Sequence, residues 1–182
     1  MSQIAINDIQ GVRLIQATYS SDMRGQFVKY RPDDVLKSEL GSVAISTNPK
    51  AGTIRGLHFQ VEPFAEEKII TCVQGSIFDV VIDIRPNSKS FGKIATLKLQ
   101  QGDAIHVYLP KGLAHGFQTL EVNTIVQYFI TSEYSPGHSY AINPLGDLGI
   151  VWPLKEFLVS DRDSNGISLA EAQLRYAESI QI

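Results

Sequence analysis

The hydrophobic and polar residues of the chain fall into short runs, some alternating and some continuously apolar, with turn residues between them. Runs of this kind are typical of β-strands. They predict strands over residues 12–18, 42–45, 68–73, 77–84, 94–99, 105–109 and 124–130. Proline, glycine and asparagine fill the intervals, as in Pro110-Lys111-Gly112. This cadence predicts an all-β sandwich or barrel.

Two segments have helical character. Residues 32–40 begin at a proline and stop before Gly41, and a terminal segment begins at Ser168. Glu171 follows Ser168 at the spacing of a capping box. We expect both helices to be short and peripheral. No internal repeat, linker or low-complexity tract occurs, which predicts one domain over residues 1–182.

The composition is that of an ordinary globular protein, with 43% hydrophobic and 19% charged residues. A net charge of −3 provides no broad basic field for nucleic acid, so a small anionic ligand held by a few cations is expected. Cys72 is the only cysteine, which excludes an internal disulfide. The amino terminus lacks a secretory signal and no run is long enough to cross a bilayer, so we expect a cytoplasmic protein without membrane association.

The segment Arg55-Gly56-Leu57-His58-Phe59-Gln60, followed by Lys68, carries the first candidate chemistry. An imidazole can act as a base near neutral pH, and a nearby ammonium can stabilise the oxyanion that proton abstraction creates. A strand whose histidine merely satisfies a hydrogen bond explains the segment equally well. Arg55 and His58 would face opposite sides of a regular strand, so a shared pocket requires a bulge near Gly56.

The histidines raise the question of a metal site. In the β-barrel jelly rolls called cupins, a first motif supplies two histidines one residue apart and then a glutamate. Here Gln60 takes the second position, although Glu66 or Glu67 offers the acid. The later run from Gly102 to His115 resembles the second cupin motif. The sequence therefore predicts a cupin-type jelly-roll barrel with short peripheral helices and no metal site.

Three further residues have both a structural and a functional interpretation. Tyr128 shares a strand face with apolar residues and is either a core aromatic or a proton donor that faces a pocket. Tyr134, in a turn, is an ordinary surface tyrosine or a ring that stacks on a planar ligand. Asp163 is a turn or capping carboxylate, or the partner that orients His58.

Asp79 and Asp83 lie on the same side of one predicted strand. Buried carboxylates are unfavourable without partners, so we expect them to pair with Arg85 or another cation. We rank both below Asp163 as functional candidates.

Several motifs together resemble the dTDP-4-dehydrorhamnose 3,5-epimerase family, and the resemblance runs from about residue 11 to residue 163. The matching positions are Arg24-Gly25, the motif from Arg55 to Gln60, Lys68, residues 79–85, residues 112–117, Tyr128, Trp152-Pro153 and residues 160–163. Their order and spacing are far more specific than any single motif. The resemblance implies a cupin-fold homodimer that needs no metal or organic cofactor, and it suggests an exchange of amino-terminal strands between subunits.

The implied reaction is epimerisation at C3, C5 or both of a nucleotide-linked 4-keto-6-deoxyhexose. Conversion of dTDP-4-dehydro-6-deoxyglucose to dTDP-4-dehydrorhamnose, in deoxysugar or surface-polysaccharide (lipopolysaccharide) biosynthesis, is the leading case. The ketone acidifies the neighbouring carbons, and reprotonation from the opposite face inverts them. By resemblance, the catalytic residues are the base His58, the acid Tyr128, the partner Asp163 and the enolate-stabilising Lys68. The implied substrate-binding residues are Arg24, Arg55 and Arg162 at the pyrophosphate, His115 in the pocket and Tyr134 at the base.

The chain departs from the family pattern at recognition positions. Lys29 stands where the family has an acid, Val43-Ala44-Ile45 replaces a Gln-x-Asn segment, and Ser139 replaces a glutamate. These changes imply retained chemistry with altered recognition. Because cytosine N3 accepts a hydrogen bond whereas thymine N3 donates one, Lys29 as a substrate-binding residue favours a cytidine sugar; a lysine that points to solvent is equally consistent.

Three alternatives stay open. A nucleotide-sugar 3,4-ketoisomerase moves protons through a related enediol. A metal-dependent cupin oxygenase is disfavoured by Gln60. A non-catalytic sugar-nucleotide-binding cupin would bind ligand without exchanging its hydrogens.

Overall fold

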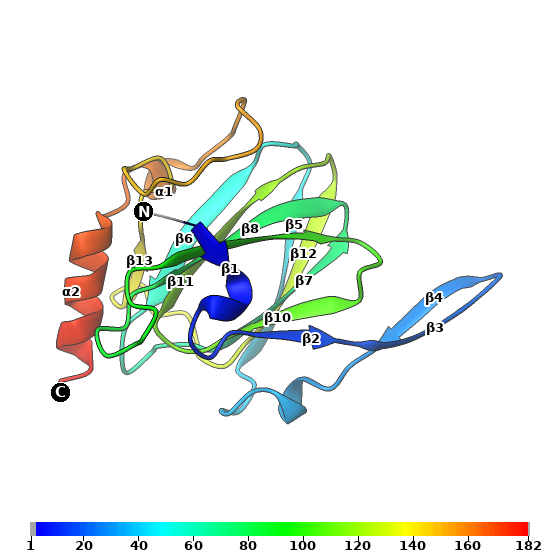
Figure 1. The fold of residues 1–182 in the computed structure, drawn as a ribbon, viewed down its shortest axis with the longest axis horizontal. Helices are drawn as coiled ribbons and strands as arrows, with labels where there is room; N and C mark the ends of the chain where they lie inside the picture. Colours follow the sequence, from blue (N-terminus) through cyan, green and yellow to red (C-terminus); the bar gives the residue numbers. More distant parts are fainter. Residues whose placement is uncertain (1–2, 182) are drawn as a thin grey trace.

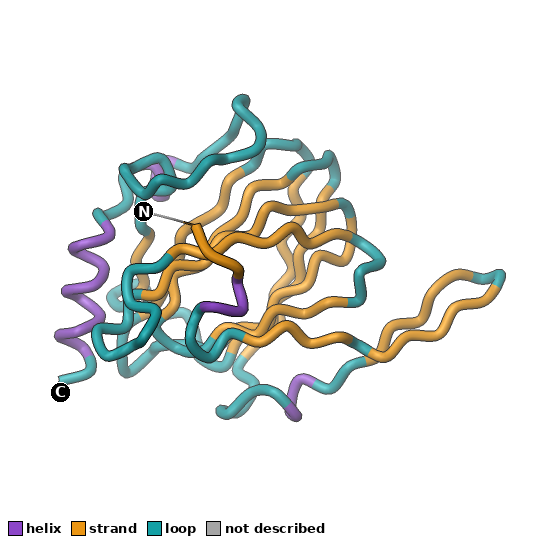
Figure 2. The backbone as a smooth tube through the Cα atoms, in the orientation of Figure 1, coloured by secondary structure: helices purple, strands orange, loops and turns teal. Residues whose placement is uncertain are grey.

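The computed structural model describes residues 3–181 and consists mainly of two facing β-sheets (Figures 1 and 2). The six-stranded sheet has the order β1 (Gln3–Ala5), β9 (Ile94–Gln100), β8 (Ser76–Asp83), β11 (Leu113–Thr119), β6 (Ile54–Gln60) and β13 (Ser139–Ala141). The five-stranded sheet has the order β2 (Arg13–Gln16), β10 (Ile105–Leu109), β7 (Lys68–Gln74), β12 (Thr124–Ile130) and β5 (Ser42–Asn48). Apart from the parallel β1–β9 pair, neighbouring strands run antiparallel.

The space between the sheets holds one of the hydrophobic cores. Alternate residues of the central strands point inward, among them Ile70 of β7, Val81 of β8, Phe117 of β11 and Val126 of β12, and each is buried. Burial of apolar surface on this scale is the main force that holds two sheets together. The predicted all-β barrel is therefore confirmed, with the candidate pocket at one end of this interior.

The outer face of the six-stranded sheet is covered by the carboxy-terminal part of the chain. Helix α2 (Leu169–Ser179) packs Ala172 and Tyr176 against this face, and Trp152 lies in the same core. The predicted helix after Ser168 is confirmed, since the Ser168 hydroxyl accepts a hydrogen bond from the Glu171 amide at 3.2 Å. Only this half of the capping box forms, because the Glu171 carboxylate pairs with Arg175 at 2.7 Å instead.

The predicted helix over residues 32–40 is wrong. Only a 3₁₀ turn, η2 (Pro32–Asp34), forms there; a second, η1 (Ile6–Asp8), follows β1. A buried side chain explains the difference: one carboxylate oxygen of Glu67 accepts hydrogen bonds from the backbone amides of Lys37 and Ser38, at 2.9 and 3.0 Å. These two tertiary bonds engage amides that a longer helix would use internally.

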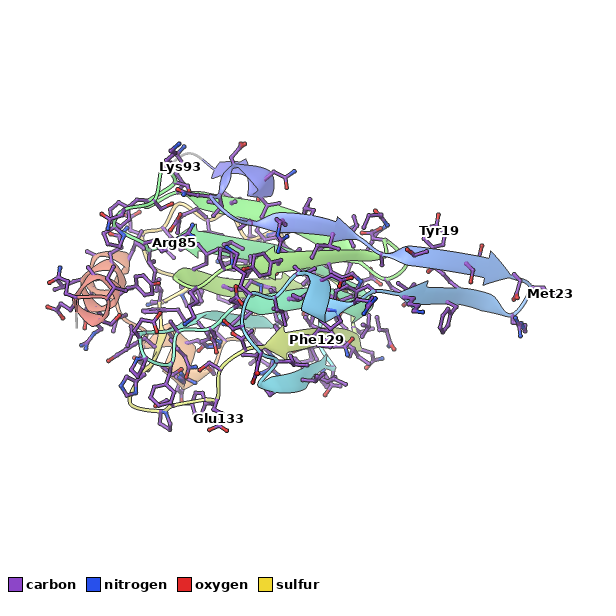
Figure 3. The ribbon with its side chains drawn as sticks, turned by 90° about the horizontal axis from the view of Figure 1, so that it is seen from below. Tyr19, Met23, Arg85, Lys93, Phe129 and Glu133 are labelled. Carbon is purple, nitrogen blue, oxygen red and sulfur yellow. The ribbon has the colours of Figure 1, made fainter. Side chains whose placement is uncertain are left out.

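The hairpin of β3 (Thr18–Asp22) and β4 (Gly25–Lys29) projects away from the barrel (Figures 1 and 3). Every residue of both strands is exposed, including Tyr19 and Phe27, at 55% and 69%. The predicted strand over residues 12–18 is thus divided between β2 and this arm. We name residues 18–29 the arm. Its apolar side chains have little to pack against within one chain.

Residues 3–181 contain no helix of the length and apolar character that crossing a bilayer requires.

Candidate active site

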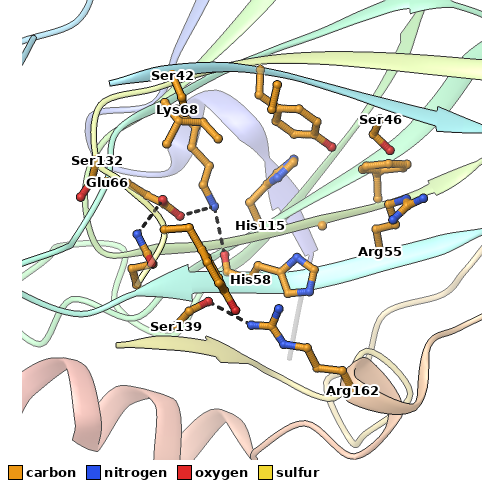
Figure 4. Close-up of a pocket in the computed structure, with 17 residues that line it drawn as sticks. Ser42, Ser46, Arg55, His58, Glu66, Lys68, His115, Ser132, Ser139 and Arg162 are labelled. Carbon is orange, nitrogen blue, oxygen red and sulfur yellow. Dashed lines mark hydrogen bonds and ion pairs between the residues drawn. The ribbon is translucent and has the colours of Figure 1, made fainter. Parts of the chain in front are cut away.

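A cavity of about 310 Å³ opens between the two sheets (Figure 4). Residues from both sheets and from the carboxy-terminal segments line it: Ser42, Ala44, Ser46, Arg55, His58, Gln60, Glu66, Lys68, His115, Gly116, Phe117, Tyr128, Ile130, Ser132, Tyr134, Ser139 and Arg162. Eight of the ten sequence-predicted site residues meet at this place, seven in the lining and Asp163 behind His58.

A bulge lets Arg55 and His58 face the same cavity. The register between β6 and β11 shifts between His115 and Phe117, and Gly56 has φ +112°. A side chain at Gly56 would place its Cβ 2.6 Å from the carbonyl oxygen of His115, so only glycine fits. The bulge predicted from the three-residue spacing of Arg55 and His58 is confirmed.

His58 is held from behind by Asp163. The Nε2 atom of His58 lies 2.7 Å from Oδ1 of Asp163, while Oδ2 accepts a hydrogen bond from the Gly56 amide at 3.1 Å. Asp163 belongs to the short helix α1 (Asp161–Ser164), where Ser160 caps its amide. Burial opposes ionisation of Asp163, but the hydrogen bonds and charge of His58 and the Gly56 amide hold its pKa below the usual value. The pair therefore suits a histidine that accepts a proton.

Tyr128 reaches the cavity from the opposite sheet, on the inward face of β12. Its ring stands nearly perpendicular to that of His115, with the centroids 6.3 Å apart. Burial and, secondarily, the negative charge of Asp79 raise the pKa of Tyr128. The phenol is consequently held in its protonated form, the form that can donate a proton.

Lys68 lies in the cavity and is paired with a carboxylate that the sequence had suggested only as a metal ligand. Its ammonium is 2.8 Å from Oε1 of Glu66 and 3.4 Å from the carbonyl oxygen of His58 (Figure 4). Both side chains are largely buried, at 10% and 12% exposed. An ammonium held in place by a carboxylate can stabilise a nearby oxyanion.

Gln60 has a structural role at the position where cupins carry a histidine. Its amide nitrogen donates to the carbonyl oxygens of Phe64 and Glu133 and to Glu66, each at 3.0 Å, and its oxygen accepts from the Ser135 amide at 2.7 Å. The donor set does not suit a metal either: within residues 3–181, no three His, Cys, Asp or Glu side chains are grouped so that they could hold an ion.

Two guanidinium groups stand at the mouth of the cavity. Arg55 donates from Nε to Asn48 at 2.7 Å, and Arg162 donates to the Ser139 hydroxyl at 2.9 Å. Among the described residues no carboxylate pairs with either group. The Arg162 guanidinium also lies 5.9 Å from the centre of the Tyr134 ring, which is 64% exposed. The mouth thus presents two cations and an aromatic face.

Two predicted binding residues do not reach this cavity within one chain. Arg24 sits at the tip of the arm and pairs with Asp22 at 2.6 Å, and Lys29 borders a separate hollow beside His106. Val43 and Ile45, at the Gln-x-Asn position, also point away: both lie on the outer face of β5, at 52% and 65% exposed. Of that segment only Ala44 lines the cavity.

Some lining residues were missed from sequence, and one pair was only partly foreseen. Ser42 and Ser46 of β5 line the cavity together with Ala44, whereas Val43 and Ile45 between them do not, and this period of two was the available signal. Asp83 pairs with Arg85 at 2.7 Å, as predicted. Asp79 instead lies 2.7 Å from His115, a contact between neighbouring strands that local sequence does not encode.

A histidine, a tyrosine and a lysine that face one cavity between two β-sheets are groups suited to proton transfer, and comparisons with known proteins place the chain in a family of sugar-nucleotide isomerases. A sequence model of the family described as dTDP-4-dehydrorhamnose 3,5-epimerase matches residues 7–171. The chain belongs to this family and is an epimerase. The resemblance inferred from the motifs is confirmed.

Named relatives align with nearly the whole of this chain. A dTDP-4-dehydrorhamnose 3,5-epimerase of Mycolicibacterium smegmatis is 41% identical, over 91% of this chain and 85% of its own. One of Sinorhizobium fredii is 34% identical, over 92% and 90%. Other matched relatives are named as 3-epimerases. The crystal structure of NovW, a 4-keto-6-deoxy sugar epimerase of Streptomyces spheroides, superposes with a TM-score of 0.85 at 31% identity, covering 91% of this chain and 86% of that one. The cupin-like fold is confirmed.

Proposed function

We propose that this epimerase inverts C3, C5 or both in a nucleotide-linked 4-keto-6-deoxyhexose by proton transfer between His58 and Tyr128. One observation carries the proposal: His58 on β6 and Tyr128 on β12 project from facing sheets into a single cavity. A sugar ring held between them presents one face to each side chain. Inversion requires this arrangement, because the proton must leave from one face and return on the other.

The reaction begins when Nδ1 of His58 takes the proton from the carbon next to the ketone, because Nε2 donates its hydrogen to the Asp163 carboxylate. The electron pair of the broken C–H bond moves to the C4 oxygen, which becomes an enolate. Asp163 stabilises the imidazolium that forms, since it keeps a buried negative charge against the ring. The Tyr128 hydroxyl then protonates the same carbon from the other side and the ketone re-forms.

The enolate oxygen requires a positive partner in the cavity. Lys68 is suited to this role because its ammonium lies beside the His58 backbone, inside the lining. Glu66 fixes the ammonium through the 2.8 Å ion pair. A donor held in place before the reaction stabilises a developing charge better than one that must reorganise.

The cations at the mouth are suited to a diphosphate. Arg55 and Arg162 each retain donors beyond the single hydrogen bond found for them, and guanidinium groups match phosphate oxygens in pairs. Tyr134 offers a ring on which the nucleotide base can stack. Relatives of known structure support this ligand class: one epimerase of Bacillus anthracis was crystallised with TDP and pyrophosphate.

The arm suggests how Arg24 and Lys29 join the site. We infer a homodimer in which the arm crosses to a second copy, since Phe27 and Tyr19 are exposed on it and Val43 and Ile45 on the outer sheet face. Burying these apolar side chains between copies would stabilise such a dimer. Sedimentation analysis should find a dimer for the native chain and a weakened one for Phe27→Asp. A monomer at working concentration would contradict the assignment.

We also propose that this enzyme is located in the cytoplasm.

The nucleotide base is tested by comparing binding of dTDP and CDP to the native protein and to Lys29→Glu. If Lys29 donates a hydrogen bond to cytosine, the native chain should bind CDP more tightly than dTDP, and the variant should gain affinity for dTDP relative to CDP. A strong native preference for dTDP would remove the cytidine hypothesis while leaving the epimerase chemistry intact.

The chemistry is tested by incubating dTDP- and CDP-4-keto-6-deoxyglucose with the protein in deuterated water and following label by NMR. Deuterium at C3, C5 or both with inversion identifies the centres. His58→Ala should abolish the exchange, and Tyr128→Phe should impair reprotonation more than the first loss of hydrogen. Migration of the ketone would instead identify a 3,4-ketoisomerase, and binding without exchange a non-catalytic protein. Full turnover by both variants would refute the two roles.

A further inference from the structure

The interior of the barrel contains a carboxylate that is only half satisfied. Asp79 is 0% exposed, and its Oδ1 lies 2.7 Å from Nε2 of His115. Its Oδ2 is buried and has no hydrogen-bond partner among the residues that the structure describes. An unpaired buried carboxylate oxygen is destabilising, so a structural role alone does not account for it.

A second carboxylate on the same face of β8 has hydrogen-bond partners for both of its oxygens. Asp83 is equally buried, and it accepts hydrogen bonds from the Arg85 guanidinium and from the hydroxyls of Ser88 and Ser90. Its group lies away from the cavity. Asp79, by contrast, lies behind a cavity residue, and apolar replacement of such a buried pair is commonly neutral or stabilising. The carboxylate with fewer hydrogen bonds is thus the one in contact with a residue of the cavity lining.

His115 connects Asp79 to the proposed acid. It lines the cavity, is 4% exposed, and stands with its ring centre 6.3 Å from that of Tyr128. Its second ring nitrogen, Nδ1, makes no hydrogen bond with the described residues. No direct hydrogen bond joins these two described side chains, and this separation of the rings allows one bridging water. The other charged or titratable groups that act on Tyr128 are Arg55 and Cys72.

The proposed reaction leaves an imbalance of protons. After each inversion His58 carries the proton taken from the substrate and Tyr128 is a phenolate. His58, with a side chain that is 37% exposed, can lose its proton to solvent at the mouth. Tyr128 lines the cavity between the sheets, so its phenolate has to be reprotonated there before the next inversion.

We propose that Asp79 and His115 form a relay that returns a proton to Tyr128 after each inversion. This role rests on the proposed function. The N–H bond at Nδ1 of a His115 imidazolium breaks, the proton passes through the bridging water, and the O–H bond of Tyr128 forms. The Asp79 carboxylate, which accepts from Nε2, stabilises the imidazolium before the transfer. Neutral His115 then regains a proton from bulk solvent, conducted by water in the cavity, and the proton that His58 releases to solvent balances the cycle.

The relay is tested by rapid-quench measurement of inverted centres per active site, with 4-keto-6-deoxy sugar nucleotide in excess. For Asp79→Asn, which keeps the shape and removes the charge, we expect one inversion per site at a rate within about twofold of the native protein. A steady state slower by about tenfold or more should follow. Added imidazole buffer should restore the steady rate, because it supplies the proton from outside. Asp83→Asn is the matched control and should show neither burst nor buffer rescue.

Two results would overturn the relay: native steady-state turnover by Asp79→Asn, or equal slowing of its first and later inversions without buffer rescue. If Asp79→Asn does not fold, His115→Gln keeps a donor toward Asp79 but carries no exchangeable imidazolium proton. It should show the same burst, and an unchanged steady state would refute the relay. A native protein that inverts no centre would overturn the proposed function itself, whereas a native protein that turns over normally isolates the failure to the relay.

Discussion

The Nε2 atom of His58 and the Oδ1 atom of Asp163 lie 2.7 Å apart, although 105 positions separate the two residues in the chain. Asp163 reaches His58 because helix α1 places it beside β6, and its second oxygen is fixed by the Gly56 amide. The carboxylate therefore both orients the imidazole and supports its protonated form.

Replacing Asp163 with asparagine should keep the geometry and lose the charge. We expect kcat to fall by about 10²–10⁴-fold with little change in KM, because the imidazolium forms only during the reaction. Asp161→Asn on the same helix is the control, since its side chain is exposed, and it should leave kcat unchanged. A large rise in KM with normal kcat for Asp163→Asn would place Asp163 in substrate binding instead.

The cations at the mouth predict a charge-dependent binding step. Arg55→Lys and Arg162→Lys should each weaken dTDP binding by about tenfold, or about 1.4 kcal/mol, because an ammonium cannot pair with two phosphate oxygens as guanidinium does. Calorimetric titration at two salt concentrations measures the effect. Lys98→Gln removes an exposed cation outside the cavity lining and should leave the affinity as it is. Unaltered affinity in both arginine variants would refute the assignment.

The bulge in β6 makes Gly56 a stability-determining position. Gly56→Ala should lower the free energy of unfolding by more than about 2 kcal/mol, because φ is +112° and the new Cβ would lie 2.6 Å from a backbone oxygen. Urea denaturation measures the loss. Gly137→Ala, where nothing lies within 4 Å of the added Cβ, should be within experimental error of the native chain. Equal stability of the two variants would show that the bulge tolerates a side chain.

The lowered pKa of Asp83 should make the free energy of unfolding depend on pH. Burial alone would raise its pKa, but hydrogen bonds from Arg85, Ser88 and Ser90 lower it below the usual value. A depressed folded-state pKa contributes stability above the unfolded value, about 3.9, and this contribution is lost as the pH falls through the folded value. Asp83→Asn should therefore be about 2–3 kcal/mol less stable than the native protein at pH 7, and the difference should shrink below about pH 4.

Denaturation curves at pH 7, 5 and about 3 test the dependence. Asp147→Asn, which alters an exposed carboxylate, should track the native protein across the series. A difference between Asp83→Asn and the native chain that grew in acid would have the wrong sign for a carboxylate that is stabilised in its ionised form.

The fold was largely predictable because its strands carry local signals. β10 and β12 match the predicted ranges 105–109 and 124–130 from end to end, since their apolar residues are bounded by turn residues. Other strands were missed. The short strands β4 and β13 have no clear apolar alternation, and β11, although every residue in it is buried, contains a histidine, a glycine and polar residues that hide its pattern. The failure at residues 32–40 has another cause, because the Glu67 carboxylate that interrupts this helix comes from a distant part of the chain.

The candidate site also contains features that local sequence predicts and features that it does not. A spacing argument predicted the bulge at Gly56, because side-chain alternation in a strand is fixed by geometry. Pairing across strands is not fixed locally, so the contact between Asp79 and His115 could not be read from either segment. The locations of Arg24 and Lys29 depend on where the arm goes, which one chain's sequence pattern does not determine.

The amide of Gln60 bears on any attempt to redesign this barrel as a metalloenzyme. A histidine at position 60 would supply the missing imidazole, but it would also release the backbone of Phe64, Glu133 and Ser135, which the glutamine now ties together. The turn that carries Tyr134 would lose its anchor at the same time. Regaining a bound ion would therefore require rebuilding this turn, and the single exchange would more readily damage nucleotide recognition than create new reactivity.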